Sequence, residues 1–116
     1  MKVLVVDDDR SWRDIVSSVL QRAGWEVVEA ESGEKALEIF SGAGPGEFKV
    51  IVTDYDMGEG RLNGAGLIAR ARELRGADVS YIMLTGGDID TAWADIFLTK
   101  RDFSGDVLLA AVGSPA

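Results

Sequence analysis

The stretch VLVVDDDR (residues 3–10) runs from four aliphatic residues directly into Asp7, Asp8 and Asp9. An unbroken aliphatic run of this kind is typical of a strand that is buried on both faces of a parallel sheet. Three like charges directly after such a strand repel one another, and each raises the pKa of its neighbours unless a cation joins them. The stretch therefore predicts a buried strand whose carboxyl end carries either a helix cap or a cation site.

Further strands alternate with helices along the chain. Apolar residues at helical spacing, such as Ile15, Val16 and Leu20, predict a helix after the first strand. The other predicted strands cover residues 25–30, 48–53, 79–84 and 95–99. This alternation predicts an α/β fold, with a doubly wound, mainly parallel five-stranded sheet and helices on both faces. No linker interrupts the pattern, so we expect residues 1–116 to form a single domain.

Composition removes several classes of function. The 116 residues include neither cysteine nor histidine, which excludes disulfides, zinc–thiolate sites and Ser-His or Cys-His nucleophile pairs. The formal net charge of −8 argues against a nucleic-acid binder, which needs a basic surface. The sequence contains no apolar run of membrane-spanning length and no signal peptide, so we expect a cytoplasmic protein without membrane partners.

Polar residues follow four of the predicted strands. They are Asp7, Asp8 and Asp9 after the first strand, Asp54 and Asp56 after the third, Thr85 after the fourth and Lys100 after the fifth. The carboxyl ends of parallel strands meet at one edge of a sheet, where the ligand site of an open α/β fold lies. Magnesium prefers such oxygen ligands, and an amine and a hydroxyl suit phosphoryl oxygens. The pattern predicts a magnesium site at which a carboxylate could carry a phosphoryl group.

Each of these residues also has a purely structural interpretation. Asp8 or Asp9 could cap the first helix, and Asp54 and Asp56 could be turn residues. A single lysine such as Lys100 is usually a solvated surface group. The functional interpretation is favoured because four separate strands each end in a suitable residue type.

The motifs in this order resemble a response-regulator receiver domain of bacterial two-component signalling. The resemblance covers nearly the whole chain and rests on four segments. They are VLVVDDDRSWRDIV (3–16), VIVTDYDM (50–57), YIMLTGG (81–87) and IFLTK (96–100). It implies a flavodoxin-like sheet with strand order 2-1-3-4-5. It also implies a signalling domain that catalyses its own aspartyl phosphorylation and dephosphorylation rather than a conventional turnover enzyme.

The resemblance also implies a role for each site residue. The resemblance implies that Asp54 is the phosphoacceptor and that a sensor histidine kinase or a phosphotransfer protein supplies the phosphoryl group. Mg²⁺ is held by Asp7, Asp8 and Asp54, and by the backbone carbonyl of Asp56. Thr85 and Lys100 contact the phosphoryl group, and Phe97 changes rotamer as Thr85 moves. Asp9 helps to start the first helix, and the phosphorylated domain signals to a downstream protein partner.

Two single-residue departures from the family pattern lie beside this site. Gly58 follows Met57 where the family usually has proline, and the glycine-rich loop at 58–64 is longer than usual. From this departure we expect a looser rim of the site. Arg101 follows Lys100 in place of a proline whose peptide bond is usually cis. A cis bond without proline costs ~2.5–4 kcal/mol, so either the bond is trans and Lys100 is aimed differently, or the fold tolerates the strain.

The largest departure is the short segment between Thr85 and Lys100. The family fits its fourth helix and fifth strand there, but residues 86–93 leave room for a helical turn or two at most. We therefore expect the family's fourth helix to be missing or vestigial, as in a subgroup associated with HWE-class histidine kinases. Trp93 would then help to cover the exposed sheet face, and residues 86–93 would order on phosphorylation.

Two other functions compete with the phosphoryl-accepting one. A pseudo-receiver has the same fold and serves as a docking scaffold without phosphorylation, and the Lys100-Arg101 step slightly favours it. A carboxylate–metal enzyme is the third possibility. Asp54 and Asp56 form the Asp-x-Asp pattern of haloacid-dehalogenase-like phosphatases and of Toprim-like nuclease modules, although each family places its acids differently.

Overall fold

The strands and helices of the computed structural model follow the predicted alternation. It describes residues 1–44, 46–58, 60–75, 78–86 and 94–115. The elements in chain order are β1 (Lys2–Val6), α1 (Arg10–Arg22), β2 (Glu26–Ala30), α2 (Gly33–Gly42), β3 (Phe48–Thr53), α3 (Gly64–Arg75), β4 (Ser80–Thr85), β5 (Ile96–Thr99) and α4 (Gly105–Val112). Nowhere in these ranges is a helix long and apolar enough to cross a membrane.

The five strands form one sheet in the order β2-β1-β3-β4-β5, and every neighbouring pair is parallel. This confirms the predicted doubly wound sheet and its strand order. At the carboxyl ends, Val6 pairs with both Ala30 and Thr53, and Thr85 pairs with Thr99. The residues that follow these strands therefore meet at one edge.

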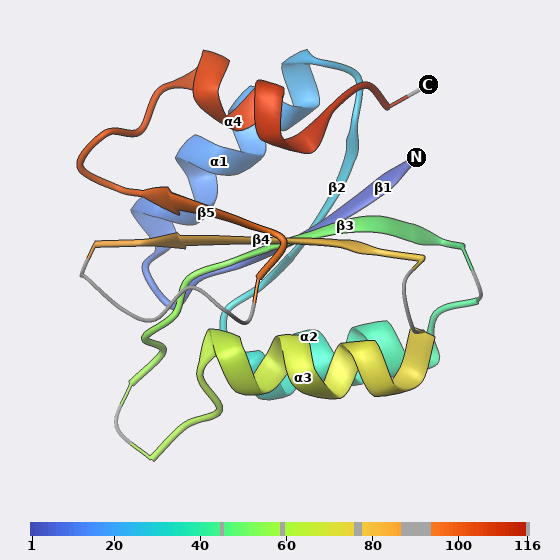
Figure 1. Cartoon of the computed structure of the whole chain (residues 1–116). Coiled ribbons are helices and arrows are strands. Elements are labelled where there is room, and N and C mark those ends of the chain that lie inside the picture. The colour runs from blue at the N-terminus through green and yellow to red at the C-terminus, as the bar shows by residue number, and fades with distance from the viewer. Residues whose placement is uncertain (45, 59, 76–77, 87–93, 116) are drawn as a thin grey trace.

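Helices cover both faces of the sheet: α1 and α4 lie on one face and α2 and α3 on the other (Figure 1). Successive residues of a strand point to opposite faces, so β1 serves two cores. Val3 and Val5 pack in the cluster that contains Leu108 of α4, whereas Leu4 packs with Leu67 of α3. Burial on both faces explains why β1 is aliphatic throughout.

The first helix begins at the third aspartate of the opening stretch. Asp9 is the N-cap of α1, and its Oδ1 accepts hydrogen bonds from the backbone N–H groups of Ser11 at 2.9 Å and Trp12 at 3.4 Å. These bonds satisfy two of the N–H groups that a helix start leaves without partners. The expectation that Asp9 helps to start the helix is therefore met, which leaves Asp7 and Asp8 for another purpose.

The connection between β4 and β5 is short, as the sequence predicts. Residues 86–95 join the two strands, which is consistent with a shortened fourth helix of the family. The helix labelled α4 follows β5 and therefore takes the place of the family's fifth helix (Figure 1). The predictions for Trp93 and for ordering within residues 86–93 fall on residues 87–93, which lie outside the described residues.

Candidate functional site

Asp7 occupies the position directly after β1. Its backbone N–H donates to the carbonyl of Ala30 at 3.2 Å, and its Oδ1 accepts from the backbone N–H of Asp9 at 2.9 Å. Asp7 is buried, with 4% of its surface exposed, whereas Asp8 is exposed. The strand thus delivers one inner and one outer carboxylate to the same edge.

Asp54 occupies the matching position after β3. Its backbone N–H donates to the carbonyl of Val6 at 2.9 Å, which places it beside the end of β1. Its side chain is buried, and its Oδ1 accepts from the backbone N–H of Tyr55 at 2.9 Å. Thr85, also buried, ends the neighbouring strand β4. A carboxylate and a hydroxyl therefore end adjacent strands.

Lys100 brings a positive charge to this edge from the end of β5. Its backbone N–H donates to the carbonyl of Thr85 at 2.8 Å. Its Nζ lies 2.9 Å from Asp7 Oδ2 and 3.5 Å from Asp54 Oδ2. The peptide bond from Lys100 to Arg101 is trans, like every other bond in the described ranges, and the ammonium still points at both buried carboxylates.

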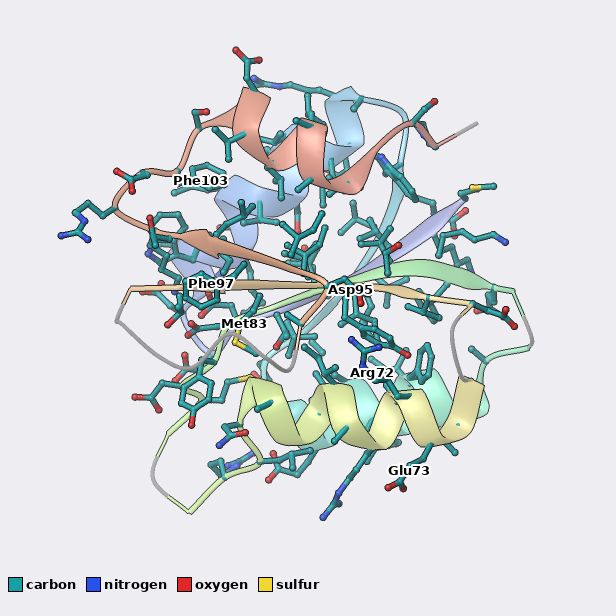
Figure 2. All side chains as sticks on the ribbon, in the orientation of Figure 1. Arg72, Glu73, Met83, Asp95, Phe97 and Phe103 are labelled. Atoms are coloured by element: carbon teal, nitrogen blue, oxygen red, sulfur yellow. The ribbon has the colours of Figure 1, made fainter. Side chains whose placement is uncertain are left out.

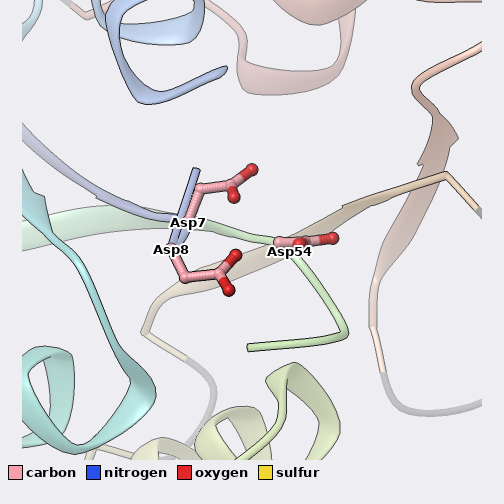
Figure 3. A group of neighbouring side chains, drawn as sticks. All are labelled: Asp7, Asp8 and Asp54. Carbon is pink, nitrogen blue, oxygen red and sulfur yellow. The ribbon is translucent and has the colours of Figure 1, made fainter. Parts of the chain in front are cut away.

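Three carboxylates form a compact cluster at the edge. Asp7, Asp8 and Asp54 each place an oxygen within 4.8 Å of the others. Figure 3 shows that Asp7 and Asp8 follow β1, that Asp54 follows β3, and that their side chains extend to the same side. Hard oxygen ligands of this kind fit Mg²⁺, which is bound through a few carboxylates and keeps several waters.

The electrostatics of the buried pair favour a bound cation. Burial, reinforced by the nearby Asp7 charge, raises the pKa of Asp54 from 3.8 to about 6, although Lys100 and the Tyr55 N–H oppose this shift. Burial also raises the pKa of Asp7, while the Asp9 N–H and Lys100 lower it. Lys100 compensates for only part of the unfavourable environment of the two carboxylates. A divalent cation at the cluster would stabilise their ionised forms further.

The cluster faces an open cleft of about 620 Å³. The cleft is lined by Asp8, Asp9, Asp54, Tyr55, Asp56, Gly58, Thr85, Gly86 and Lys100. The predicted residues at the ends of β3, β4 and β5 thus share one cavity with Asp8. Asp7 lies behind this lining and reaches it through its contact with Lys100.

Two of the predicted site residues lie at the margins of the cluster. Asp56 lines the cleft, but its side chain turns into the loop and accepts from the backbone N–H of Gly58 at 3.1 Å. Phe97 is half-buried in β5, where it pairs with Met83 of β4 and packs on the α2–α3 side of the sheet (Figure 2). The metal role of the Asp56 carbonyl and the rotamer change of Phe97 stay predictions.

The loop after Asp54 is anchored at two points. Glu34 of α2 accepts from the backbone N–H of Leu62 at 2.9 Å and lies 3.4 Å from the Arg61 guanidinium. At the end of the loop, Gly64 donates its N–H to the carbonyl of Tyr55 at 2.7 Å. A Cβ at Gly64 would collide with the carbonyl of Asp54, so the close approach requires glycine. These contacts hold the rim of the cleft against α2.

Two residues that support the site, Arg13 and Trp12, were not predicted from the sequence. The guanidinium of Arg13 donates to the backbone carbonyl of Asp7 at 2.7 Å. The indole ring of Trp12 lies beside Lys100, whose Nζ is 5.0 Å from the ring centroid. Both residues fall in the first turn of the helix that Asp9 caps, so their proximity to the acidic stretch was the available signal.

The fold and this edge define a class of protein: a flavodoxin-like α/β domain whose site combines clustered carboxylates with the amine of Lys100 and the hydroxyl of Thr85. The sequence matches the family model described as the response regulator receiver domain over residues 3–103. It is 39% identical over 87 residues to the chemotaxis protein CheY1 of Helicobacter pylori, a match that spans 73% of this chain and 67% of that protein.

Solved structures agree with the sequence comparison. A response regulator receiver domain protein from Clostridium thermocellum superposes with a TM-score of 0.84 at 28% identity, over 96% of this chain and 90% of that one. A response regulator protein from Burkholderia pseudomallei, solved with a phosphorylated aspartic acid and a calcium ion, gives a TM-score of 0.78 at 28% identity. That match covers 97% of this chain and 66% of that one. The chain belongs to the response regulator receiver domain family of two-component signalling.

Proposed function

We propose that this domain accepts a phosphoryl group on Asp54 in a Mg²⁺-dependent step and signals the change to a protein partner. The observation that carries the proposal is the position of Asp54. This buried carboxylate lies in an open cleft, with the Lys100 ammonium 3.5 Å away and the carboxylates of Asp7 and Asp8 beside it. The site therefore brings together a carboxylate that can act as a nucleophile, an ammonium group, and two further carboxylates that can bind a metal ion.

The reaction transfers a phosphoryl group from a phosphohistidine of a sensor histidine kinase or of a phosphotransfer protein. A carboxylate oxygen of ionised Asp54 forms the new P–O bond, and the P–N bond to the histidine breaks. The imidazole leaves with the electron pair of that bond and takes up a proton. Negative charge spreads over the phosphoryl oxygens as this happens, and catalysis depends on positioned cations and hydrogen-bond donors.

The side chains around Asp54 divide this work. Lys100 would contact one phosphoryl oxygen with its ammonium, and the hydroxyl of Thr85 would donate to another. Asp7, Asp8, Asp54 and the carbonyl of Asp56 would hold Mg²⁺. When bound, the ion neutralises phosphoryl charge and helps to orient the donor.

Signal output would start at Thr85 and Phe97. Thr85 ends β4 in the cleft wall, and Phe97 pairs with Met83, two residues before Thr85, from the edge strand β5. A shift of Thr85 toward a phosphoryl group on Asp54 would open space for the half-buried ring of Phe97. The altered surface around β5 would then be what a downstream protein recognises.

The position of Lys100 weakens the scaffold alternative. That alternative drew support from the Lys100-Arg101 step, yet the trans bond leaves the ammonium in contact with Asp7 and Asp54. A phosphatase or Toprim-like enzyme gains no specific support from the cleft.

The test is intact mass spectrometry after incubation with Mg²⁺ and acetyl phosphate. Wild type should gain one phosphoryl group, and neither Asp54→Asn nor a sample with excess chelator should gain one. Asp14→Asn is the matched control, because it removes an exposed carboxylate of α1 that does not line the cleft. Beryllofluoride binding, followed by NMR, serves if small donors react slowly. The absence of both an adduct and a beryllofluoride-dependent shift in wild type would overturn the proposal.

A further inference from the structure

Trp12 is the aromatic residue at the start of α1. Its backbone N–H is one of the two that Asp9 caps, at 3.4 Å, so its position is tied to the acidic stretch that forms the site. The side chain is half-buried and packs beside the core on the α1–α4 face. Packing alone would account for a tryptophan at this position, but Lys100 and Phe103 also lie against its ring.

The ring of Trp12 lies between the site and the turn that follows β5. Lys100 Nζ lies over the indole ring, 5.0 Å from its centroid. Phe103 meets the same ring edge-to-face, with centroids 5.5 Å apart and an interplanar angle of 87°. The backbone N–H of Phe103 donates to the carbonyl of Lys100 at 3.3 Å. The turn that carries Lys100 thus also supplies the aromatic partner of Trp12.

The Lys100 ammonium is therefore enclosed on several sides. Asp7 Oδ2 lies at 2.9 Å, Asp54 Oδ2 at 3.5 Å and the face of Trp12 below 6 Å, and only 14% of the side chain is exposed. Cation–π attraction is stronger when the cation is desolvated. A lysine side chain is long and flexible, and any contact that restricts it reduces the conformational freedom lost in the reaction.

We propose that Trp12 is a positioning residue whose indole ring holds the Lys100 ammonium against the carboxylates of Asp7 and Asp54. The role in phosphoryl transfer rests on the proposed function of Asp54. Trp12 is not among the residues that line the cleft, so it would act on the reaction through Lys100. It defines where the ammonium lies before a phosphoryl group arrives, and it limits the retreat of the ammonium into solvent.

The placement itself is testable without any phosphoryl group. Protons above the face of an aromatic ring are shielded, so the ε-methylene protons of Lys100 should resonate upfield of those of Lys2, Lys35 and Lys49. Lysine-selective ¹³C labelling of the whole chain resolves these few signals. The shift should persist in Trp12→Phe, reduced because the ring is smaller, and should vanish in Trp12→Leu. A Lys100 signal that coincides with the other lysines in wild type would overturn the proposal.

The role in transfer is tested by a double-mutant cycle. The rate of adduct formation from acetyl phosphate is measured at saturating Mg²⁺ for wild type, Trp12→Leu, Lys100→Ala and the double variant. In this reaction Asp54 gains the P–O bond and acetate leaves. We expect Trp12→Leu to slow wild type by about threefold to tenfold. When Trp12→Leu is added to Lys100→Ala, the rate should fall by less than about twofold, because the effects of two interacting residues are not additive.

Trp25→Leu is the matched control for lost aromatic volume. Trp25 packs in the same core cluster as Trp12 but precedes β2, at the other end of the sheet from the site. Trp25→Leu should lower the unfolding midpoint. It should leave unchanged both the transfer rate of the folded protein and the upfield shift of the Lys100 ε-methylene protons. Equal slowing by Trp12→Leu with and without Lys100 would overturn the positioning role. If wild type forms no adduct, the proposed function fails, and the Lys100 shift alone decides whether Trp12 holds the ammonium.

Discussion

Lys100 Nζ lies 3.5 Å from Asp54 Oδ2. The contact links the residue that follows β5 to the residue that follows β3, although the two are far apart in the chain. The contact lowers the pKa of Asp54 against the larger effect of burial, which raises it. Lys100 thus favours the ionised, nucleophilic form of the carboxylate before reaction, and it would neutralise phosphoryl charge during it.

Removal of the ammonium should therefore slow transfer strongly. We expect Lys100→Ala to reduce the rate of adduct formation by about a hundredfold to a thousandfold, the range seen when one preorganised donor to a charged transition state is lost. Time-resolved intact mass spectrometry measures the rate. Lys35→Ala, which removes an exposed lysine on α2, should leave the rate unchanged. Equal rates for Lys100→Ala and wild type would show that Lys100 is only a structural partner of Asp7.

The raised pKa of Asp54 predicts an unusual pH dependence of stability. Between its ordinary value of 3.8 and about 6, the folded protein retains a proton that the unfolded chain has released. Stability due to this group is therefore greatest at low pH and falls as pH rises through that window. Asp54→Asn should be more stable than metal-free wild type by about 1–3 kcal/mol at pH 7, and equally stable below pH ~4.

Urea unfolding of the two proteins from pH 4 to 7.5 measures this difference directly. The difference between wild type and variant isolates Asp54 from the other titrating groups. Saturating Mg²⁺ at pH 7 should reduce or reverse the advantage of Asp54→Asn, because the ion binds the folded wild-type carboxylates. A difference that is constant with pH would contradict the raised pKa.

The outer carboxylate of the cluster should control metal affinity. Asp8→Asn removes a charged oxygen within 4.8 Å of those of Asp7 and Asp54 without disturbing the Lys100–Asp7 contact. We expect Mg²⁺ affinity to fall by about tenfold or more, as for loss of a ligand or its close support. NMR titration gives the dissociation constant. Asp14→Asn on the exposed side of α1 is the control, and equal affinities for Asp8→Asn and wild type would exclude Asp8 as a ligand.

A separate cluster anchors the start of β5. Asp95 Oδ2 accepts from the backbone N–H of Tyr81 at 2.9 Å, the Asp95 N–H donates to the carbonyl of Tyr81 at 2.9 Å, and Asp95 Oδ1 lies 3.0 Å from the Arg72 guanidinium (Figure 2). Asp95→Ala should lower the free energy of unfolding by about 1–3 kcal/mol, because the Tyr81 N–H loses its acceptor. Asp95→Asn keeps an acceptor and should cost less than about 1 kcal/mol, as for an exposed ion pair.

Urea unfolding compares these variants with Arg72→Met. The arginine variant removes the ion pair and the contact of the guanidinium with the Tyr81 ring, 4.5 Å from its centroid, and leaves the Asp95–Tyr81 hydrogen bond in place. It should therefore match Asp95→Asn more nearly than Asp95→Ala. Equal losses from Asp95→Ala and Asp95→Asn would mean that the ion pair, and not the hydrogen bond to β4, anchors the strand.

The fold and the cluster of acids followed from local sequence patterns. Unbroken aliphatic strands such as residues 3–6 and the helical stripes between strands define a parallel sheet, and a parallel sheet brings its carboxyl ends together. For that reason Asp7, Asp54 and Lys100 could be placed at one edge without knowledge of any distance. Asp9 was identifiable as a cap because capping depends only on neighbouring residues.

Contacts between side chains from distant elements were not predictable in the same way. The position of Trp12 over Lys100 depends on how far α1 lies from the turn after β5, and the role of Asp95 depends on its pairing with Tyr81. Ile15 fits the apolar stripe of the first helix, yet its exposed fraction is 45%. The stripe that faces the sheet is narrower than the sequence pattern, and it centres on Val16 and Leu20.

The most direct test of the central claim is chemical mapping of the phosphorylated residue. Borohydride reduces an aspartyl phosphate to homoserine, which peptide mass spectrometry locates in the sequence. After reaction with Mg²⁺ and acetyl phosphate, we predict homoserine at position 54, dependent on Mg²⁺ and strongly reduced in Lys100→Ala. Homoserine at position 7, 8 or 56 with none at position 54, or its absence from a sample whose mass shows a phosphoryl adduct, would contradict the account.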